Sequence, residues 1–168
     1  MDISRFNALG SNDAAAVLRP CADIDRWIDA ILGARPFDSY EELLACAQNA
    51  ADPFTEAEID AALAHHPRIG ERATGSSAEA SLSRGEQSTL NLDERIAAEL
   101  LAANRAYEDR FARVFLIRAA GRSSEEILAE LRRRLDNDPD VELAEAGGQL
   151  RAIALLRLAA VFSRVPSS

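Results

Sequence analysis

The chain has 168 residues, 48% of them hydrophobic, which is enough for one globular domain with its own core and excludes a disordered chain. Its formal net charge of −9 would repel a phosphate backbone, so we expect no nucleic-acid partner. No apolar run approaches the roughly 20 residues of a membrane span, and the first residues do not resemble a signal peptide, so we expect a cytoplasmic protein without membrane association.

Two short helices are predicted first along the chain. Residues 11–18 form one, which Ser11 can cap and which Pro20 ends. A second pattern covers about 22–32 and closes at Gly33. Its large apolar residues recur at helical spacing on one face, namely Ile24, Trp27, Ile28 and Ile31.

Two further helices follow before position 65. Asp38 or Ser39 can begin the first, whose apolar stripe consists of Tyr40, Leu43, Leu44 and Ala47. Thr55 and Glu58 form a capping box for the second, which is expected to run to about Ala64.

The helical pattern breaks over residues 65–82. Pro67 biases His66 out of the helical region of backbone space, and the Gly-Ser-Ser stretch 75–77 is typical of a loop. A long helical pattern then covers about 84–112, with a possible interruption near Asn91.

A short apolar run at 114–117 is too brief to assign by periodicity, and we interpret it as an extended connection. Ser123 and Glu126 then form a second capping box, which predicts a helix that ends near Leu135.

The last predicted helix begins where Asp138 provides a cap before Pro139, and it reaches about Phe162. Two adjacent glycines at 147 and 148 would weaken its first half. Since no convincing strand pair or repeat is present, the sequence predicts an all-α, single-domain bundle of about seven to eight helices over residues 1–168.

The absence of lysine narrows the chemistry. All 19 basic residues are arginine, which excludes a lysine Schiff base, pyridoxal-phosphate chemistry and a Walker phosphate loop. The two cysteines, Cys21 and Cys46, match no zinc-binding spacing and sit in apolar helical patterns. We therefore expect buried free thiols.

His66 is a candidate acid or base, because imidazole titrates near neutral pH. The alternative is a helix C-terminal residue that interacts only with the helix dipole, and for a lone histidine this alternative is favoured. The neighbouring His65 does not support a metal site, since adjacent helical side chains point in different directions.

The stretch Ser83-Arg84-Gly85-Glu86-Gln87 allows two interpretations. Ser83 and Glu86 fit a capping box, which would be purely structural. A helix N-terminus also offers free N–H groups and positive potential to an anion, and the residues alone do not favour either interpretation.

Arg157 is the only polar residue between Ala152 and Phe162. Apolar residues share its helical face, so we expect its guanidinium to be at least partly buried and to need an anionic partner. That partner is either a carboxylate of the protein or the carboxylate of a substrate.

Together these segments resemble the 2-oxo-4-hydroxy-4-carboxy-5-ureidoimidazoline (OHCU) decarboxylases. The similarity covers nearly the whole chain in the expected order. It rests on Leu63–Arg72 with its His-Pro turn, on Ser83–Gln87, on Asn104, Tyr107 and Phe111 with Phe115–Ile117, and on Ile127-Leu128, Leu135, Asn137, Glu142 and Ile153–Leu158.

The resemblance implies a cofactor-independent decarboxylase that forms (S)-allantoin from the small-molecule substrate OHCU, as a possible homodimer. It implies His66 and Glu86 as catalytic residues and no metal ligands. The substrate-binding residues that it implies are Pro67, Ser83, Arg84, Gly85, Glu86, Gln87, Phe115, Leu116, Ile117, Arg118, Ala119 and Arg157.

Two alternatives come from other classes of function. A non-catalytic helical interaction module would scatter His66, Glu86 and Arg157 and expose an apolar groove to a partner helix. A metal-dependent hydrolase would use the two histidines with carboxylates, although their spacing is poor.

Overall fold

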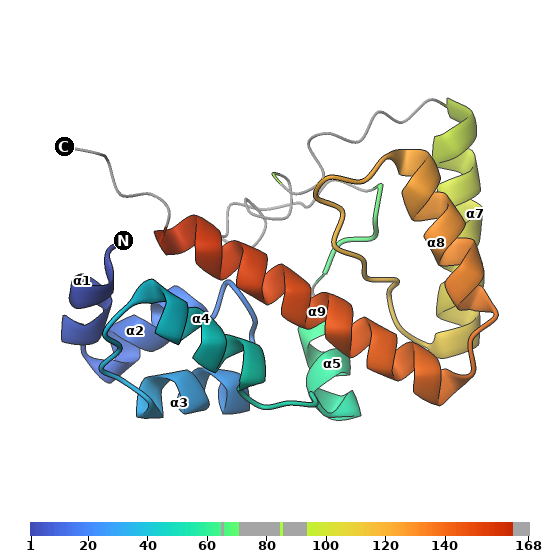
Figure 1. Cartoon of the computed structure of the whole chain (residues 1–168). Coiled ribbons are helices and arrows are strands. Elements are labelled where there is room, and N and C mark those ends of the chain that lie inside the picture. The colour runs from blue at the N-terminus through green and yellow to red at the C-terminus, as the bar shows by residue number, and fades with distance from the viewer. Residues whose placement is uncertain (65, 71–84, 86–93, 163–168) are drawn as a thin grey trace. The chain divides into compact units, whose positions relative to one another are not determined.

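The computed structural model describes residues 1–64, 66–70, 85 and 94–162. Eight helices and no strand lie within these residues, which confirms the all-α prediction (Figure 1). The chain divides into two compact units, one formed by Met1–Phe54 with Arg151–Ser168 and the other by Thr55–Leu150. A single domain over the whole chain stays a prediction.

Four short helices and the end of a long one build the first unit: α1 (Ile3–Ala8), α2 (Ser11–Leu18), α3 (Asp25–Gly33), α4 (Tyr40–Asn49) and the last residues of α9 (Pro139–Phe162). Helix α1 was not predicted, because six residues are too few for a periodic signal. Its start is nevertheless encoded locally, since the Asp2 side chain accepts the Arg5 N–H at 2.8 Å.

Two predicted boundaries in this unit were wrong. Ser11 is the first helical residue of α2, and the N-cap position is occupied by Gly10, which has no side chain to accept a capping hydrogen bond. Helix α3 begins at Asp25 rather than near 22, because the N–H groups of Cys21 and Ala22 still bond back to the Leu18 carbonyl at 2.8 and 3.3 Å. The predicted cap at Ser39 is confirmed, with its hydroxyl accepting the Glu42 N–H at 3.2 Å.

The core of the first unit is built around Trp27, which is fully buried and donates its indole N–H to the Ala47 carbonyl at 2.8 Å. Phe6 meets Phe162 edge to face, with ring centroids 5.5 Å apart. Such pairs add to the stabilisation from apolar burial. The end of α9 therefore completes the core of the N-terminal helices.

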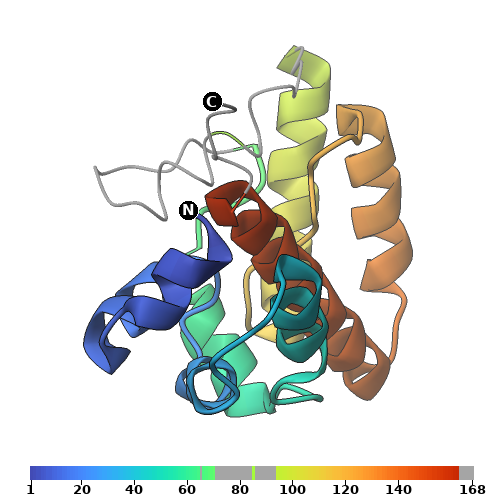
Figure 2. The ribbon, with the colours of Figure 1, turned by 60° about the vertical axis from the view of Figure 1, so that its left-hand side comes forward.

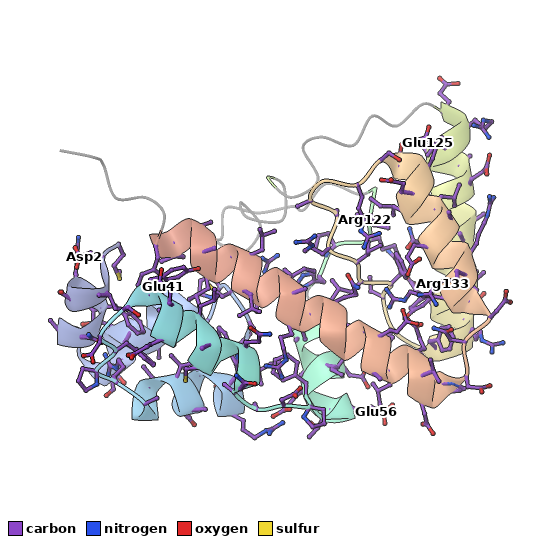
Figure 3. The ribbon with its side chains drawn as sticks, in the orientation of Figure 1. Asp2, Glu41, Glu56, Arg122, Glu125 and Arg133 are labelled. Atoms are coloured by element: carbon purple, nitrogen blue, oxygen red, sulfur yellow. The ribbon has the colours of Figure 1, made fainter. Side chains whose placement is uncertain are left out.

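The second unit contains α5 (Glu56–Leu63), α7 (Glu94–Phe111), α8 (Ser124–Leu135) and the first half of α9. Both predicted capping boxes are confirmed, Thr55 with Glu58 and Ser123 with Glu126. Charges along α8 complement its dipole, with Glu125 in the first turn and Arg133 in the last (Figure 3).

Helices α7 and α8 lie side by side and run in the same direction (Figures 1 and 2). The connection 112–123 must therefore return along them, and α8 alone rises about 18 Å over its 12 residues. This topology explains why residues 114–119 are neither helix nor strand, as predicted for the run at 114–117.

The core of this unit has Tyr107 at its centre. It is fully buried, and its ring meets Phe115 edge to face with centroids 5.2 Å apart. Twelve residues form this cluster, hereafter the α7–α8 cluster: Ile69, Ile96, Leu100, Ala103, Tyr107, Phe111, Phe115, Ile117, Ala119, Ile127, Leu128 and Leu131. No helix in the described ranges is both long and apolar enough to span a membrane.

Candidate active site

His66 lies two residues beyond Ala64, the C-cap of α5. The His66 N–H bonds to the Leu63 carbonyl at 3.0 Å, so the chain makes one more turn before Pro67. Both ring nitrogens of His66 are shielded from solvent, although the residue as a whole is only half-buried. The imidazole therefore lies just beyond a helix end, with both ring nitrogens out of contact with solvent.

The segment after His66 is held against α7. The guanidinium of Arg68 makes two bonds to the Glu108 carboxylate, at 2.5 and 2.9 Å. The Asn104 side-chain amide donates to the Ile69 carbonyl at 3.2 Å, and the Ile69 side chain is buried in the α7–α8 cluster. A residue that follows a helix end would otherwise be mobile, so these contacts restrict the backbone that carries His66.

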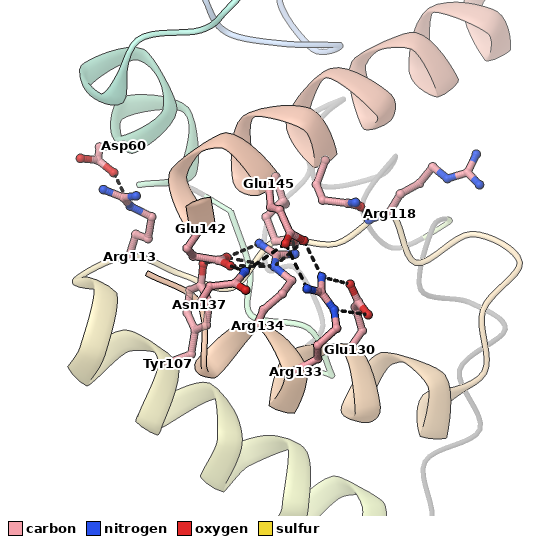
Figure 4. A network of polar contacts seen from close by, with 12 residues as sticks. Asp60, Tyr107, Arg113, Arg118, Glu130, Arg133, Arg134, Asn137, Glu142 and Glu145 are labelled. Carbon is pink, nitrogen blue, oxygen red and sulfur yellow. Dashed lines mark hydrogen bonds and ion pairs between the residues drawn. The ribbon is translucent and has the colours of Figure 1, made fainter. Parts of the chain in front are cut away.

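The predicted substrate-binding residues Phe115–Ala119 lie in the returning connection between α7 and α8. Four of their side chains are at most 5% exposed, and that of Arg118 is exposed and extends away from the buried network (Figure 4). Phe115, Ile117 and Ala119 belong to the same cluster as Ile69. The structure therefore brings the His-Pro segment and this connection onto one hydrophobic cluster.

A buried charge network supports the connection (Figure 4). Arg134 and Glu142 form an ion pair in which both side chains are 0% exposed. The Tyr107 hydroxyl donates to the Glu142 carboxylate, and Asn137 donates to it at 2.9 Å. Burial raises the pKa of Tyr107 above its usual range, and the bond to Glu142 raises it further.

Two carboxylates lie at the edge of this network. The Arg133 guanidinium bonds to both Glu130 and Glu145, and it is the main reason why the pKa of each carboxyl lies below its usual value. Arg133 is half-exposed, whereas the neighbouring Arg134 is enclosed. Removal of the Arg134 side chain is therefore expected to lower the free energy of unfolding much more than removal of the Arg133 side chain.

Arg134 was missed at the sequence level, where the run Arg132–Arg134 fits a solvated basic helix end. A signal was present, because Arg134 follows Ile127 by seven positions and Leu131 by three, which places it on the core face of α8. Glu142 and Asn137 were noted only as parts of the family resemblance, without a role.

Most of the stretch that contains the predicted partner of His66 lies outside the described residues. Ser83, Arg84, Glu86 and Gln87 lie outside the described residues, as does His65. Gly85 is described, and it is exposed with a helical backbone. The pairing of His66 with Glu86 therefore stays a prediction. Within the described residues, no group of three or more His, Cys, Asp or Glu side chains is placed to hold a metal ion.

Arg157 is 2% exposed, which confirms the predicted burial. One partner of its guanidinium is the Pro20 carbonyl, at 3.1 Å. Arg157 belongs to the first unit and His66 to the second, so their convergence stays a prediction. A carboxylate partner for Arg157, from the protein or from a substrate, also stays a prediction.

Burial of the two thiols was predicted, and it is confirmed for Cys21, which is 1% exposed, whereas Cys46 is only half-buried. Burial raises the pKa of Cys21 to about 12, against a smaller opposing effect of the Arg157 charge.

We expect iodoacetamide at pH 8 to label Cys46 in the native protein well before Cys21, because only the thiolate reacts. Mass spectrometry of the labelled peptides checks this order. Equal labelling rates would contradict it, and labelling in denaturant provides the control.

Comparison with known proteins shows similarity to one enzyme family, in sequence and in structure. The family model described as OHCU decarboxylase matches residues 7–159. A 2-oxo-4-hydroxy-4-carboxy-5-ureidoimidazoline decarboxylase from Haloferax volcanii is 29% identical over 82% of each chain. One from Amia calva is 33% identical over 77% of this chain and 75% of its own. A crystal structure of OHCU decarboxylase in the presence of (S)-allantoin has a TM-score of 0.67 and 26% identity, and the match covers 86% of this chain and 96% of that one.

Proposed function

The chain belongs to the OHCU decarboxylase family, and from this premise we propose which of its residues carry the reaction. It is a carboxy-lyase that decarboxylates OHCU in urate degradation. The observation that carries this conclusion is the family match over residues 7–159, which includes His66, Pro67 and Phe115–Ala119.

We propose that the reaction needs no cofactor. OHCU has a carboxylate and a hydroxyl on one ring carbon, beside a carbon–nitrogen double bond. As the bond to the carboxylate breaks and carbon dioxide departs, the electron pair moves toward that double bond. The nitrogen of that double bond takes up a proton. The hydroxyl group then loses its proton as its carbon becomes the ring carbonyl, and the neighbouring ring carbon takes up one proton, so that the net uptake is a single proton. The substrate therefore supplies its own electron sink, which agrees with a chain that has no lysine for a Schiff base.

In this proposal His66 is the acid or base that acts on the ring hydroxyl or on the protonated carbon. Glu86 orients the imidazole or binds ring N–H groups, and Arg157 holds an anionic or carbonyl oxygen of the substrate. The remaining residues line the pocket and bind the ureido group and ring oxygens: Pro67, Ser83, Arg84, Gly85, Gln87, Phe115, Leu116, Ile117, Arg118 and Ala119. Delivery of the proton to one face makes the product (S)-allantoin.

The described geometry supports this assignment in one respect. Contacts from α7 hold the backbone around His66, through Arg68–Glu108 and Asn104–Ile69. Charge redistribution in a decarboxylation is best served by groups that are already oriented, because no reorganisation is then needed during the reaction.

Three broader features are also proposed. Cytoplasmic localisation follows from the sequence composition, and a homodimer follows from the family resemblance. Nucleic acid is not proposed as a partner, given the net charge of −9. The interaction-module alternative is not favoured, because the family is enzymatic.

The test is circular dichroism of allantoin formed from freshly generated OHCU. The spontaneous reaction gives a racemic product, so we expect a growing optical signal only when the protein is present. Heat-denatured protein is the control. A protein sample that leaves both the rate and the optical signal at the spontaneous level would contradict the proposed function.

A further inference from the structure

The connection between α7 and α8 carries five of the proposed substrate-binding residues, Phe115–Ala119, on a backbone without regular hydrogen bonding. Such segments are usually the most mobile parts of a fold. A backbone that binds substrate must instead be held in place, because a displacement of about 1 Å can cost a large factor in rate. The structure shows two side chains that hold it.

The first is Arg134, near the end of α8. Its Nη1 donates to the Leu116 carbonyl at 2.7 Å. The rest of the guanidinium is held by Glu142, with both side chains fully buried. The planar fork of arginine can bind a carboxylate and a carbonyl together, so Arg134 connects the start of α9 to the connection.

The second is Gln149, on α9. Its Oε1 accepts the backbone N–H of Arg118 at 2.9 Å. The Arg118 side chain is exposed, so this residue is positioned through its backbone rather than through side-chain packing. Arg134 and Gln149 thus hold positions two residues apart, from two different helices.

The bonds at the Leu116 carbonyl and the Arg118 N–H therefore restrain the backbone on both sides of Ile117. We propose that Arg134 and Gln149 are positioning residues that fix the connection so that the Ile117 backbone can bind the substrate. This inference rests on the proposed function.

A purely structural role explains this arrangement less well. A buried ion pair such as Arg134–Glu142 contributes little net stability compared with well-packed apolar residues, since both charges lose their hydration. Gln149 is only half-buried, and its bond to Arg118 is a single neutral hydrogen bond. Its loss is expected to change the fold much less than the geometry of the connection.

The experiment compares Gln149→Met with Gln149→Glu. Methionine keeps the length of the side chain and removes the acceptor, whereas glutamate keeps an oxygen that can accept the Arg118 N–H. We expect Gln149→Met to lower kcat/KM about 10- to 100-fold with the melting temperature little changed. We expect Gln149→Glu to restore most of the activity. Gln48→Met, at an exposed position of α4, is the matched control and should behave as wild type.

Hydrogen exchange of residues 114–119 gives a readout that does not depend on turnover. The inference predicts faster exchange in Gln149→Met and near wild-type exchange in Gln149→Glu. Unchanged exchange or unchanged kcat/KM in Gln149→Met would overturn it, as would a Gln149→Glu enzyme as impaired as Gln149→Met. A wild-type protein without decarboxylase activity would instead contradict the proposed function, and exchange would still show whether Gln149 holds the connection.

Discussion

The His66→Asn variant is expected to fold as wild type and to lose the accelerated, stereoselective formation of allantoin. Asparagine keeps a polar side chain of similar reach but cannot exchange a proton near neutral pH. A positioned acid or base typically contributes about 10²–10⁴-fold to a rate, so kcat is expected to fall by that order. The measurement is the optical signal of allantoin formed from fresh OHCU, together with the rate of substrate loss.

The chain offers a matched control in His65→Asn, the same substitution at the preceding residue. Because the proposal assigns no role to His65, this variant should retain nearly full activity. Turnover of His66→Asn close to wild type would reject His66 as the acid or base. Far-UV circular dichroism and the melting temperature of both variants would show that a loss of activity is not a loss of fold.

The Arg134→Met variant is expected to have the largest effect on stability. Methionine fills much of the space of arginine but leaves the fully buried Glu142 carboxylate without its cation. Removal of one partner from a buried pair typically costs about 3–5 kcal/mol in the free energy of unfolding. The Leu116 carbonyl also loses its donor in this variant. Urea denaturation followed by circular dichroism measures the change.

Two comparisons make this prediction specific. In Arg134→Met/Glu142→Leu both charges are removed, so we expect a smaller loss of stability than in Arg134→Met alone. Arg133→Met changes the adjacent, half-exposed arginine, whose bonds to Glu130 and Glu145 lie at the surface, and should cost below about 1 kcal/mol. Equal losses for Arg133→Met and Arg134→Met would contradict the argument from burial.

Local signals in the sequence predicted most helices with their starts. The capping boxes at Thr55 and Ser123, the serine cap at Ser39 and the proline at 139 all act within one helical turn, so neighbouring residues suffice to encode them. Errors occurred where the signal was weak. Helix α1 is too short to show a period, and Ser11 lies one residue inside its helix.

By itself the sequence determined the helical class, the absence of lysine chemistry, and Arg157 as a charged residue in an otherwise apolar helix. These are properties of composition and of spacing along one helix. His66 was only a candidate on the residues alone, and the family resemblance gave it a catalytic role. Only the tertiary structure decided that Ile69 and Phe115 share a cluster and that Arg134 reaches both Glu142 and the Leu116 carbonyl. Those contacts join positions far apart in the chain, and their energies depend on burial, which the packing of several helices creates together.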